Sequence, residues 1–235
     1  MFRLTQISPN VCWLEFKTRY DLCMHFWRVS EVRECPNEEL RKEMTLVGYM
    51  EWYSKEYGKG KFTYPGDWAG YNVSNEDFAH VYEHANSQLT DRNKYDTFMH
   101  YVYMFLRNTV ADKSKWYLIG TKTSDLKTLE HEYAHALYYI NNYYKMEQNA
   151  LIGDLAQNTH LAKIQNNLSD MGYSINVFDD ETQAYLATGH TSSAGTTDVL
   201  KGIPKKDVNK IVQPFIDNFE EAIQDVPIFK NRSKK

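Results

Sequence analysis

The sequence predicts an α+β fold, mainly helical, with a small sheet and a long helix near the middle of the chain. Hydrophobic residues recur at helical spacing over stretches such as 95–106 and 208–223, which is typical of amphipathic helices. Two short apolar segments, 11–16 and 116–121, have the length and composition of β-strands. With 235 residues, 42% of them hydrophobic, the chain can bury a substantial core.

The first part of the chain predicts a strand followed by helices. The alternation over 11–16 predicts the strand, and residues 21–34 predict a helix that Pro36 ends. Thr45 is a suitable N-cap for the next helix, which we expect to stop at Gly58.

The segment 62–72 is rich in turn residues and aromatics, so we expect a surface loop pinned by Trp68. Ser74 and Asp77 have the spacing of a capping box and predict the start of another helix. A longer helix is expected over 90–109, where hydrophobic residues lie three and four positions apart.

Two helices are expected in the last part of the chain. Hydrophobic residues between Leu161 and Met171 predict a helix that ends at Gly172. After Pro204 the pattern predicts a long amphipathic helix, which Pro214 should kink or divide because proline lacks a backbone donor.

Residues 131–135 read His131-Glu132-Tyr133-Ala134-His135, an HExxH pattern inside the central helical stretch. Residues four apart lie on one helix face, so both imidazoles can reach one metal ion. Zinc with nitrogen ligands and one open position makes a bound water acidic near neutral pH, and Glu132 can take the proton. The pattern therefore predicts a zinc-dependent hydrolase, and among hydrolases a peptidase.

The surroundings of the pattern favour a helix. Ser124 and Asp125 precede it as capping residues, and Asp125 also suits the positive end of the helix dipole. An apolar side is supplied by Leu129, Tyr133, Ala136 or Leu137, Ile140 and Tyr144. The alternative is two histidines and a glutamate on a solvated helix face without a metal.

A catalytic zinc needs a third protein ligand. Tyr138 and Asn141 stand where the metzincin pattern requires glycine and histidine, so that class is excluded. The segment 179–185, with Glu181 followed by Ala184, resembles the second motif of the gluzincin peptidases, a branch of the zincin superfamily. This resemblance covers about 125–190 and implies that a second helix supplies Glu181 as the ligand.

The local sequence agrees with a helix at this place. Asp179 is a suitable cap, which would put Glu181 in the first turn, and Gly189 is a suitable end. A carboxylate in a first turn can also serve only to complement the helix dipole.

Other acidic residues compete for the role of third ligand. Residues 195–198, Gly-Thr-Thr-Asp, resemble the start of the aspzincin motif, which would make Asp198 the ligand. Lys201 stands where that family has tyrosine, so the match fails at its end. Glu147 and Asp154 also lie downstream, but outside any recognisable motif.

The zincin resemblance implies further roles. A strand before the metal-binding helix pairs with extended substrate in zincins, so we expect 116–121 at the edge of a small sheet beside the metal site. The alternative from the sequence is an ordinary buried strand. Such sites often add a donor to the oxyanion, for which the candidates are Tyr185, His190 and His160. A ligand imidazole also needs an orienting partner, for which the candidates are Asp179, Asp180 and Asn142.

Composition limits the classes of molecule that the protein can be expected to bind. The net charge is −4 and the basic residues cluster only in the tail 230–235, so nucleic-acid binding has no electrostatic support. Cys12, Cys23 and Cys35 lack metal-type spacing and are expected to be reduced thiols. No signal peptide or membrane span is expected, which favours a cytoplasmic protein acting on a peptide or protein substrate.

The expected organisation has three parts: a helical N-terminal subdomain (1–110), a zincin-like metal-binding core that includes the C-terminal helix (111–229), and a basic tail (230–235). The N-terminal third resembles uncharacterised proteins of large bacteriophages in Phe16, Asp21-Leu22-Cys23, Phe26 and the loop at Asp67-Trp68. That resemblance implies no activity, but places the chain in the cytosol of an infected host. The alternative function is a metal-binding scaffold or interaction protein whose zincin-like site is inactive.

Overall fold

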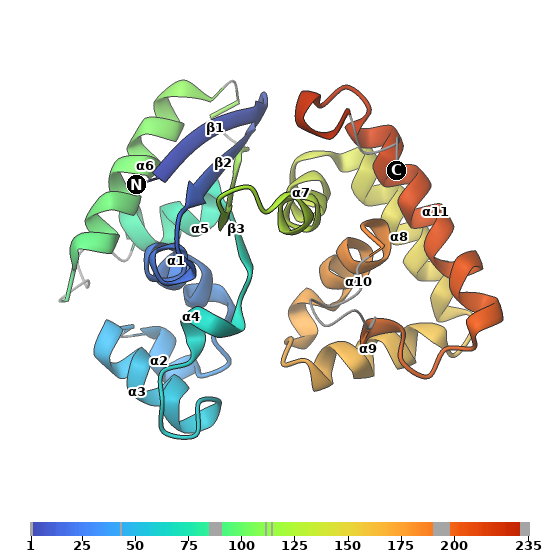
Figure 1. Ribbon diagram of the computed structural model, residues 1–235, viewed down its shortest axis with the longest axis horizontal. Helices are drawn as coiled ribbons and strands as arrows, with labels where there is room; N and C mark the ends of the chain where they lie inside the picture. Colours follow the sequence, from blue (N-terminus) through green and yellow to red (C-terminus); the bar gives the residue numbers. More distant parts are fainter. Residues whose placement is uncertain are drawn as a thin grey trace. The chain divides into compact units, whose positions relative to one another are not determined.

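The computed structural model describes residues 2–42, 44–84, 91–110, 112–113, 115–189 and 198–230. The protein has an α+β fold, mainly helical with a small mixed sheet, as the sequence predicts (Figure 1). The chain divides into a first unit, Met1–Leu129, and a second unit, Glu130–Lys235. This division lies later than the expected one near residue 110, because the strand that follows residue 116 pairs with strands of the first unit.

The first unit contains the sheet, in the order β1-β2-β4-β3. β1 (Phe2–Ser8) and β2 (Val11–Phe16) form an antiparallel hairpin. β4 (Tyr117–Lys122) runs parallel to β2 and antiparallel to β3 (Gly70–Ser74). The two predicted strands are confirmed. β1 was not expected, and β3 corrects the end of the segment predicted as a loop.

The prediction that 116–121 forms an edge strand is wrong. β4 pairs with β2 on one side and with β3 on the other, so neighbouring strands flank both of its edges. Its central residues Leu118 and Ile119 are completely buried, as expected for a strand inside a sheet. An extended substrate therefore cannot add to β4, so this strand does not have the predicted pairing role.

Helix α1 (Arg19–Glu34) packs against the sheet. It begins where the Thr18 hydroxyl accepts a hydrogen bond from the Asp21 backbone. Gly120 in β4 permits the close approach, since a Cβ at this position would lie 2.4 Å from Cε2 of Phe26. The core of the first unit forms between α1, the sheet and the helices around them.

Two of the remaining helices of the first unit begin at predicted caps. Thr45 caps α3 (Leu46–Glu56), and Ser74 and Asp77 form the predicted capping box at the start of α5 (Asn75–Ala79). The long helix α6 (Lys94–Thr109) begins after Asn93, a cap that was not predicted. The other bounds are α2 (Glu38–Lys42), α4 (Tyr64–Asp67) and the π-helical turn η1 (His80–His84).

A buried carboxyl group, Glu31 on α1, lies in the aromatic core of this unit. It is 8% exposed, and the Tyr64 hydroxyl donates a 2.7 Å hydrogen bond to its Oε1. Burial raises the pKa of Glu31 to about 7, although the hydroxyls of Tyr64 and Tyr49 oppose the rise. The carboxyl is therefore more easily kept protonated in the folded than in the unfolded chain.

Glu31→Gln is expected to remove a loss of stability that the wild type suffers as the pH rises from about 4.5 to about 7. A folded pKa above the unfolded value stabilises at low pH, and this contribution disappears as the pH rises through about 7. Between pH 5 and 8 the wild type should lose on the order of 1–3 kcal/mol relative to Glu31→Gln. Urea unfolding followed by tryptophan fluorescence measures this, since all five tryptophans lie in the first unit. The exposed Glu51→Gln is the control, and equal pH profiles for wild type and Glu31→Gln would contradict the assignment.

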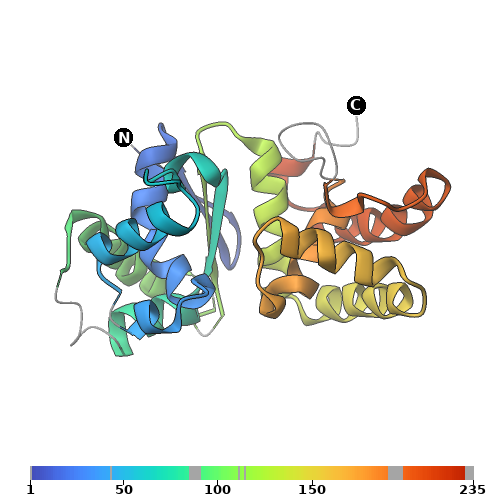
Figure 2. The same ribbon diagram turned by 90° about the horizontal axis from the view of Figure 1, so that it is seen from below.

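The second unit is helical in its described part (Figure 2). Helix α7 begins with the last residues of the first unit and continues into the second. The bounds are α7 (Leu126–Ile140), α8 (Asn142–Ala156), α9 (His160–Asp170), η2 (Ile175–Val177), α10 (Phe178–Ala187), η3 (Asp198–Leu200), α11 (Lys205–Ile223) and η4 (Pro227–Phe229).

The central helical stretch is shorter than predicted. Asn141 accepts hydrogen bonds from the backbone of Tyr143 and Tyr144 through its side-chain oxygen, and so begins α8. Tyr144 therefore lies on α8 and not on the helix that carries the HExxH pattern. The helix predicted to end at Gly172 is confirmed as α9.

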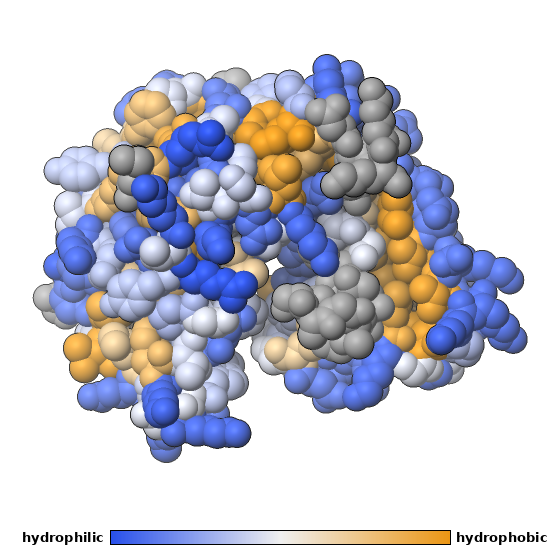
Figure 3. Space-filling model, in the orientation of Figure 1, coloured by the Kyte–Doolittle hydropathy of each residue, from blue (hydrophilic) through white to orange (hydrophobic). Residues whose placement is uncertain are grey.

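Helix α11 buries the predicted apolar face, which includes Ile211, Phe215, Phe219 and Ile223. In Figure 3, hydrophilic residues line the outer edge of this unit and a hydrophobic strip lies immediately inside them, along α11. Pro214 lies within the helix without dividing it. No helix among the described residues combines the length and the apolar character that crossing a membrane requires.

Candidate metal centre

The HExxH histidines and the predicted third ligand come together in the second unit. His131 and His135 lie on α7, Glu181 lies on α10, and their ligand atoms are all within 4.8 Å of one another. The Nε2 atom of His131 is 3.8 Å from Oε2 of Glu181, and Nε2 of His135 is 3.6 Å from Oε1. The three side chains thus converge on one point, as the i, i+4 spacing and the downstream motif predict.

The two helices that carry these residues begin differently. The Asp125 carboxylate accepts a hydrogen bond from the Thr128 backbone at the start of α7, which confirms Asp125 as a cap. Helix α10 begins after Val177, so the prediction that Asp179 caps it is wrong, although Glu181 does lie in its first turn. Gly189, with φ of +63°, follows the end of α10 as predicted.

A second carboxylate orients one imidazole. Nδ1 of His135 lies 2.8 Å from Oδ1 of Asp180. Because a carboxylate only accepts, Nδ1 is the donor, and Nε2 is turned toward Glu181. Of the three residues predicted for this orienting role, Asp180 makes the contact, whereas Asp179 and Asn142 are exposed near the starts of their helices.

Burial and charge act differently on the two histidines. Burial, together with the neighbouring His135, lowers the pKa of His131 to about 4, so this imidazole is neutral at physiological pH. Burial also disfavours the charged form of His135, but the carboxylates of Asp180 and Glu181 outweigh it and raise the pKa. These neighbouring carboxylates therefore favour positive charge at His135, where a metal cation would replace the proton.

Glu181 is a buried carboxylate that can still accept a hydrogen bond or bind a cation. It is 9% exposed, and its Oε2 atom has no hydrogen-bond partner among the described residues. Burial raises the pKa of Glu181 to about 7, whereas His135 opposes the rise. A buried acceptor without a donor is costly, and a cation bound by the two imidazoles would satisfy it.

The candidate general base lies beside the ligands. Glu132 is 6% exposed, and its charge raises the pKa of both His131 and His135. Its carboxylate therefore acts electrostatically on the same site without belonging to the group of ligand atoms.

The residues predicted as oxyanion donors have different positions. The Tyr185 ring packs edge-on against His131 with 4.7 Å between ring centroids, and its hydroxyl lies 3.0 Å from that of Tyr173. His160 is the first residue of α9 and is not in the ligand group. His190 lies outside the described residues.

The rival ligands do not join the group where the structure describes them. Glu147 and Asp154 lie on α8, and neither belongs to the cluster of His131, His135 and Glu181. The backbone of Asp198 begins η3, but its side chain lies outside the described part.

Several polar residues around the site are not evident from the sequence. Tyr173 lies close enough to Glu181 to lower its pKa by a hydrogen bond. Gln183 donates to Asp180, and Tyr144 donates to Gln183. The one available signal was the spacing of Asp180 and Gln183, which puts two polar side chains on one face of a buried helix.

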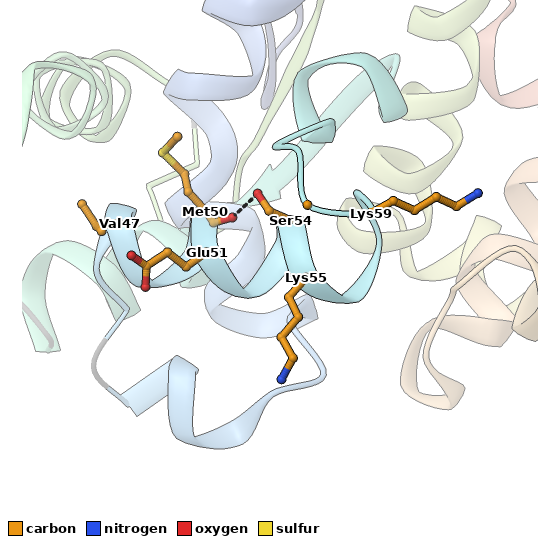
Figure 4. A pocket seen from close by; sticks show the side chains of 7 residues that line it. Val47, Met50, Glu51, Ser54, Lys55 and Lys59 are labelled. Atoms are coloured by element: carbon orange, nitrogen blue, oxygen red, sulfur yellow. Dashed lines mark hydrogen bonds between the residues drawn. The ribbon is translucent and has the colours of Figure 1, made fainter.

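A surface hollow lies elsewhere, along α3 of the first unit (Figure 4). Its lining includes Val47, Met50 and Glu51. The Ser54 hydroxyl donates to the Met50 carbonyl at 2.6 Å. Lys55 and Lys59 also line the hollow, and its described lining contains no histidine or cysteine.

The donor set fits a zinc ion. Two imidazole nitrogens and one carboxylate oxygen converge, one imidazole is oriented by a carboxylate, and a buried carboxylate oxygen has no hydrogen-bond partner in the described part of the chain. Comparisons of the chain with family models, with curated proteins and with solved structures found no match. The assignment of this site therefore depends on the geometry and chemistry of His131, Glu132, His135 and Glu181 themselves.

Proposed function

We propose that the protein is a zinc-dependent hydrolase, a metallopeptidase of the zincin type with gluzincin-like ligands. The observation that carries this proposal is the convergence of His131, His135 and Glu181 within 4.8 Å, with Glu132 beside them. A structural zinc site is normally closed by four protein ligands, whereas three ligands leave a position for water or substrate.

Different residues of the chain would bind the metal, transfer the proton and orient a ligand. His131, His135 and Glu181 would hold the metal, which when bound supplies Lewis acidity toward a carbonyl and lowers the pKa of water. Glu132 would accept a proton from the attacking water and return it to the leaving amine. Asp180 holds His135 with Nε2 directed toward the site.

The substrate is proposed to be a peptide or a protein, and the site of action the cytoplasm. The HExxH pattern favours peptide hydrolysis because its glutamate suits the two proton transfers that cleavage of an amide requires. Zinc is proposed over ferrous iron, which also suits two imidazoles and a carboxylate, because Glu132 supplies a base that hydrolysis uses.

Metal analysis and a peptide library test the proposal together. Protein purified without added metal should contain about one zinc per chain, the stoichiometry of a single catalytic site. The same protein should cleave members of a peptide library, and a chelator should stop the cleavage. Zinc without any cleavage would favour a metal-binding scaffold, and protein that takes up no zinc would contradict the proposal.

A further inference from the structure

A chain of side-chain hydrogen bonds extends behind His135 into the interior of the second unit. Oδ1 of Asp180, which accepts from His135, also accepts from Nε2 of Gln183 at 3.0 Å. Oε1 of Gln183 in turn accepts from the Tyr144 hydroxyl at 2.9 Å. These hydrogen bonds therefore join α7, α10 and α8 through four polar side chains.

The donors and acceptors of this chain have one consistent direction. The carboxylate of Asp180 only accepts, so both His135 Nδ1 and Gln183 Nε2 must donate to it. The Tyr144 hydroxyl donates to Oε1 of Gln183, which keeps the amide nitrogen turned toward Asp180. If the amide were reversed, its oxygen would face the carboxylate and the two acceptors would repel.

Gln183 and Tyr144, the two residues of this hydrogen-bonded series farthest from His135, are shielded from water. Gln183 is completely buried and Tyr144 is 3% exposed, so water does not compete for their hydrogen bonds. The side chain of Asp180, by contrast, is 33% exposed. Hydration would draw Asp180 away from His135 if Gln183 did not hold it.

We propose that Gln183, anchored by Tyr144, is a positioning residue that keeps Asp180 on His135 and so keeps His135 Nε2 available to a metal ion. This inference rests on the proposed function, since it requires that His135 is a metal ligand. Gln183 lies three residues after Asp180 on α10, so the two side chains share a helix face.

Two substitutions test this role through zinc affinity rather than through activity. Gln183→Leu removes both hydrogen bonds of the amide and should raise the dissociation constant for Zn²⁺ about tenfold or more, the lower end of the effect of losing an outer partner. Tyr144→Phe removes one hydroxyl and should raise it about threefold, the effect of one net hydrogen bond. Competition with a fluorescent chelator measures both constants on the full chain.

A matched control separates positioning from loss of stability. The Tyr138 hydroxyl donates to Asn149 and joins α7 to α8 through a separate hydrogen bond, so Tyr138→Phe should keep the wild-type affinity. The visible spectrum of bound Co²⁺ should change in Gln183→Leu and not in Tyr138→Phe, because only the former alters a ligand's orientation.

The outcomes are distinct. Wild-type affinity in both folded variants, Gln183→Leu and Tyr144→Phe, overturns the positioning role and leaves the proposed function intact. If Gln183→Leu does not fold, as judged by circular dichroism, the comparison of Tyr144→Phe with Tyr138→Phe decides alone. Wild-type protein that binds neither Zn²⁺ nor Co²⁺ overturns the proposed function and this role with it.

Discussion

Glu132→Gln is expected to lose hydrolysis by a factor of about 10² or more, the usual scale for removing a positioned acid–base group. The amide cannot accept the proton of the attacking water, whereas its size fits the same buried space. Zinc content and thermal stability should stay near the wild-type values, because Glu132 is not in the group of ligand atoms. The measurements are cleavage of a peptide selected from the library and metal content by elemental analysis.

His135→Ala provides the contrast to this variant. It should lose metal and activity together and some stability, because bound metal is linked to folding. A Glu132→Gln protein that releases zinc as readily as His135→Ala would show that Glu132 is a ligand and not a base. Undiminished cleavage by Glu132→Gln would remove it from the mechanism, and full biological function in cells would favour the scaffold.

Glu181→Gln is expected to weaken zinc binding by about 10² or more, beyond the range seen when only an outer hydrogen-bond partner is lost. The amide keeps the volume of the side chain but removes the charge, and a neutral amide oxygen is a poor zinc ligand. Burial already disfavours an unpaired carboxylate at this position, so the folded protein should tolerate the change without the metal. Zinc titration against a competing chelator measures the loss.

Two variants serve as references for this loss. Asp179→Asn removes a charge in the same first turn of α10, but from an exposed side chain, and should leave the affinity near that of the wild type. Asp198→Asn tests the remaining rival. If Asp198→Asn releases zinc while Glu181→Gln retains it, the third ligand is Asp198 and the gluzincin-like assignment is wrong.

The sequence was most informative where chemistry depends on spacing within one helix. The positions of His131, Glu132 and His135 follow from helical geometry alone. The motif at 179–185 and a first-turn position predicted Glu181 as the third candidate ligand. The convergence of its side chain with His131 and His135 agrees with that prediction. Gln183 and Tyr144 were missed because their relation to Asp180 is tertiary, and no local pattern encodes it.

The order of the strands in the sheet is also a tertiary feature that local sequence patterns do not encode. The composition of β4 correctly predicted a strand but could not show its neighbours, since strand order depends on pairing partners far apart in sequence. The first strand, β1, carries few of the buried apolar residues on which the prediction relied, and most of its residues are exposed or half-buried. The break at Asn141 was missed because the apolar spacing continues across it while the cap changes the backbone.

The placement of the candidate ligands on α7 and α10 has a consequence for metal exchange, because α8 and α9 lie between these helices in the chain. An ion held by both helices would act as a cross-link that closes a long loop, and so would narrow the ensemble of the unfolded chain as a disulfide does. Release of the ion would require ligands on both helices to let go, so local separation of α10 from α7 would speed its exchange. The residence time of the metal and the protection of α10 amides from hydrogen exchange should then change together.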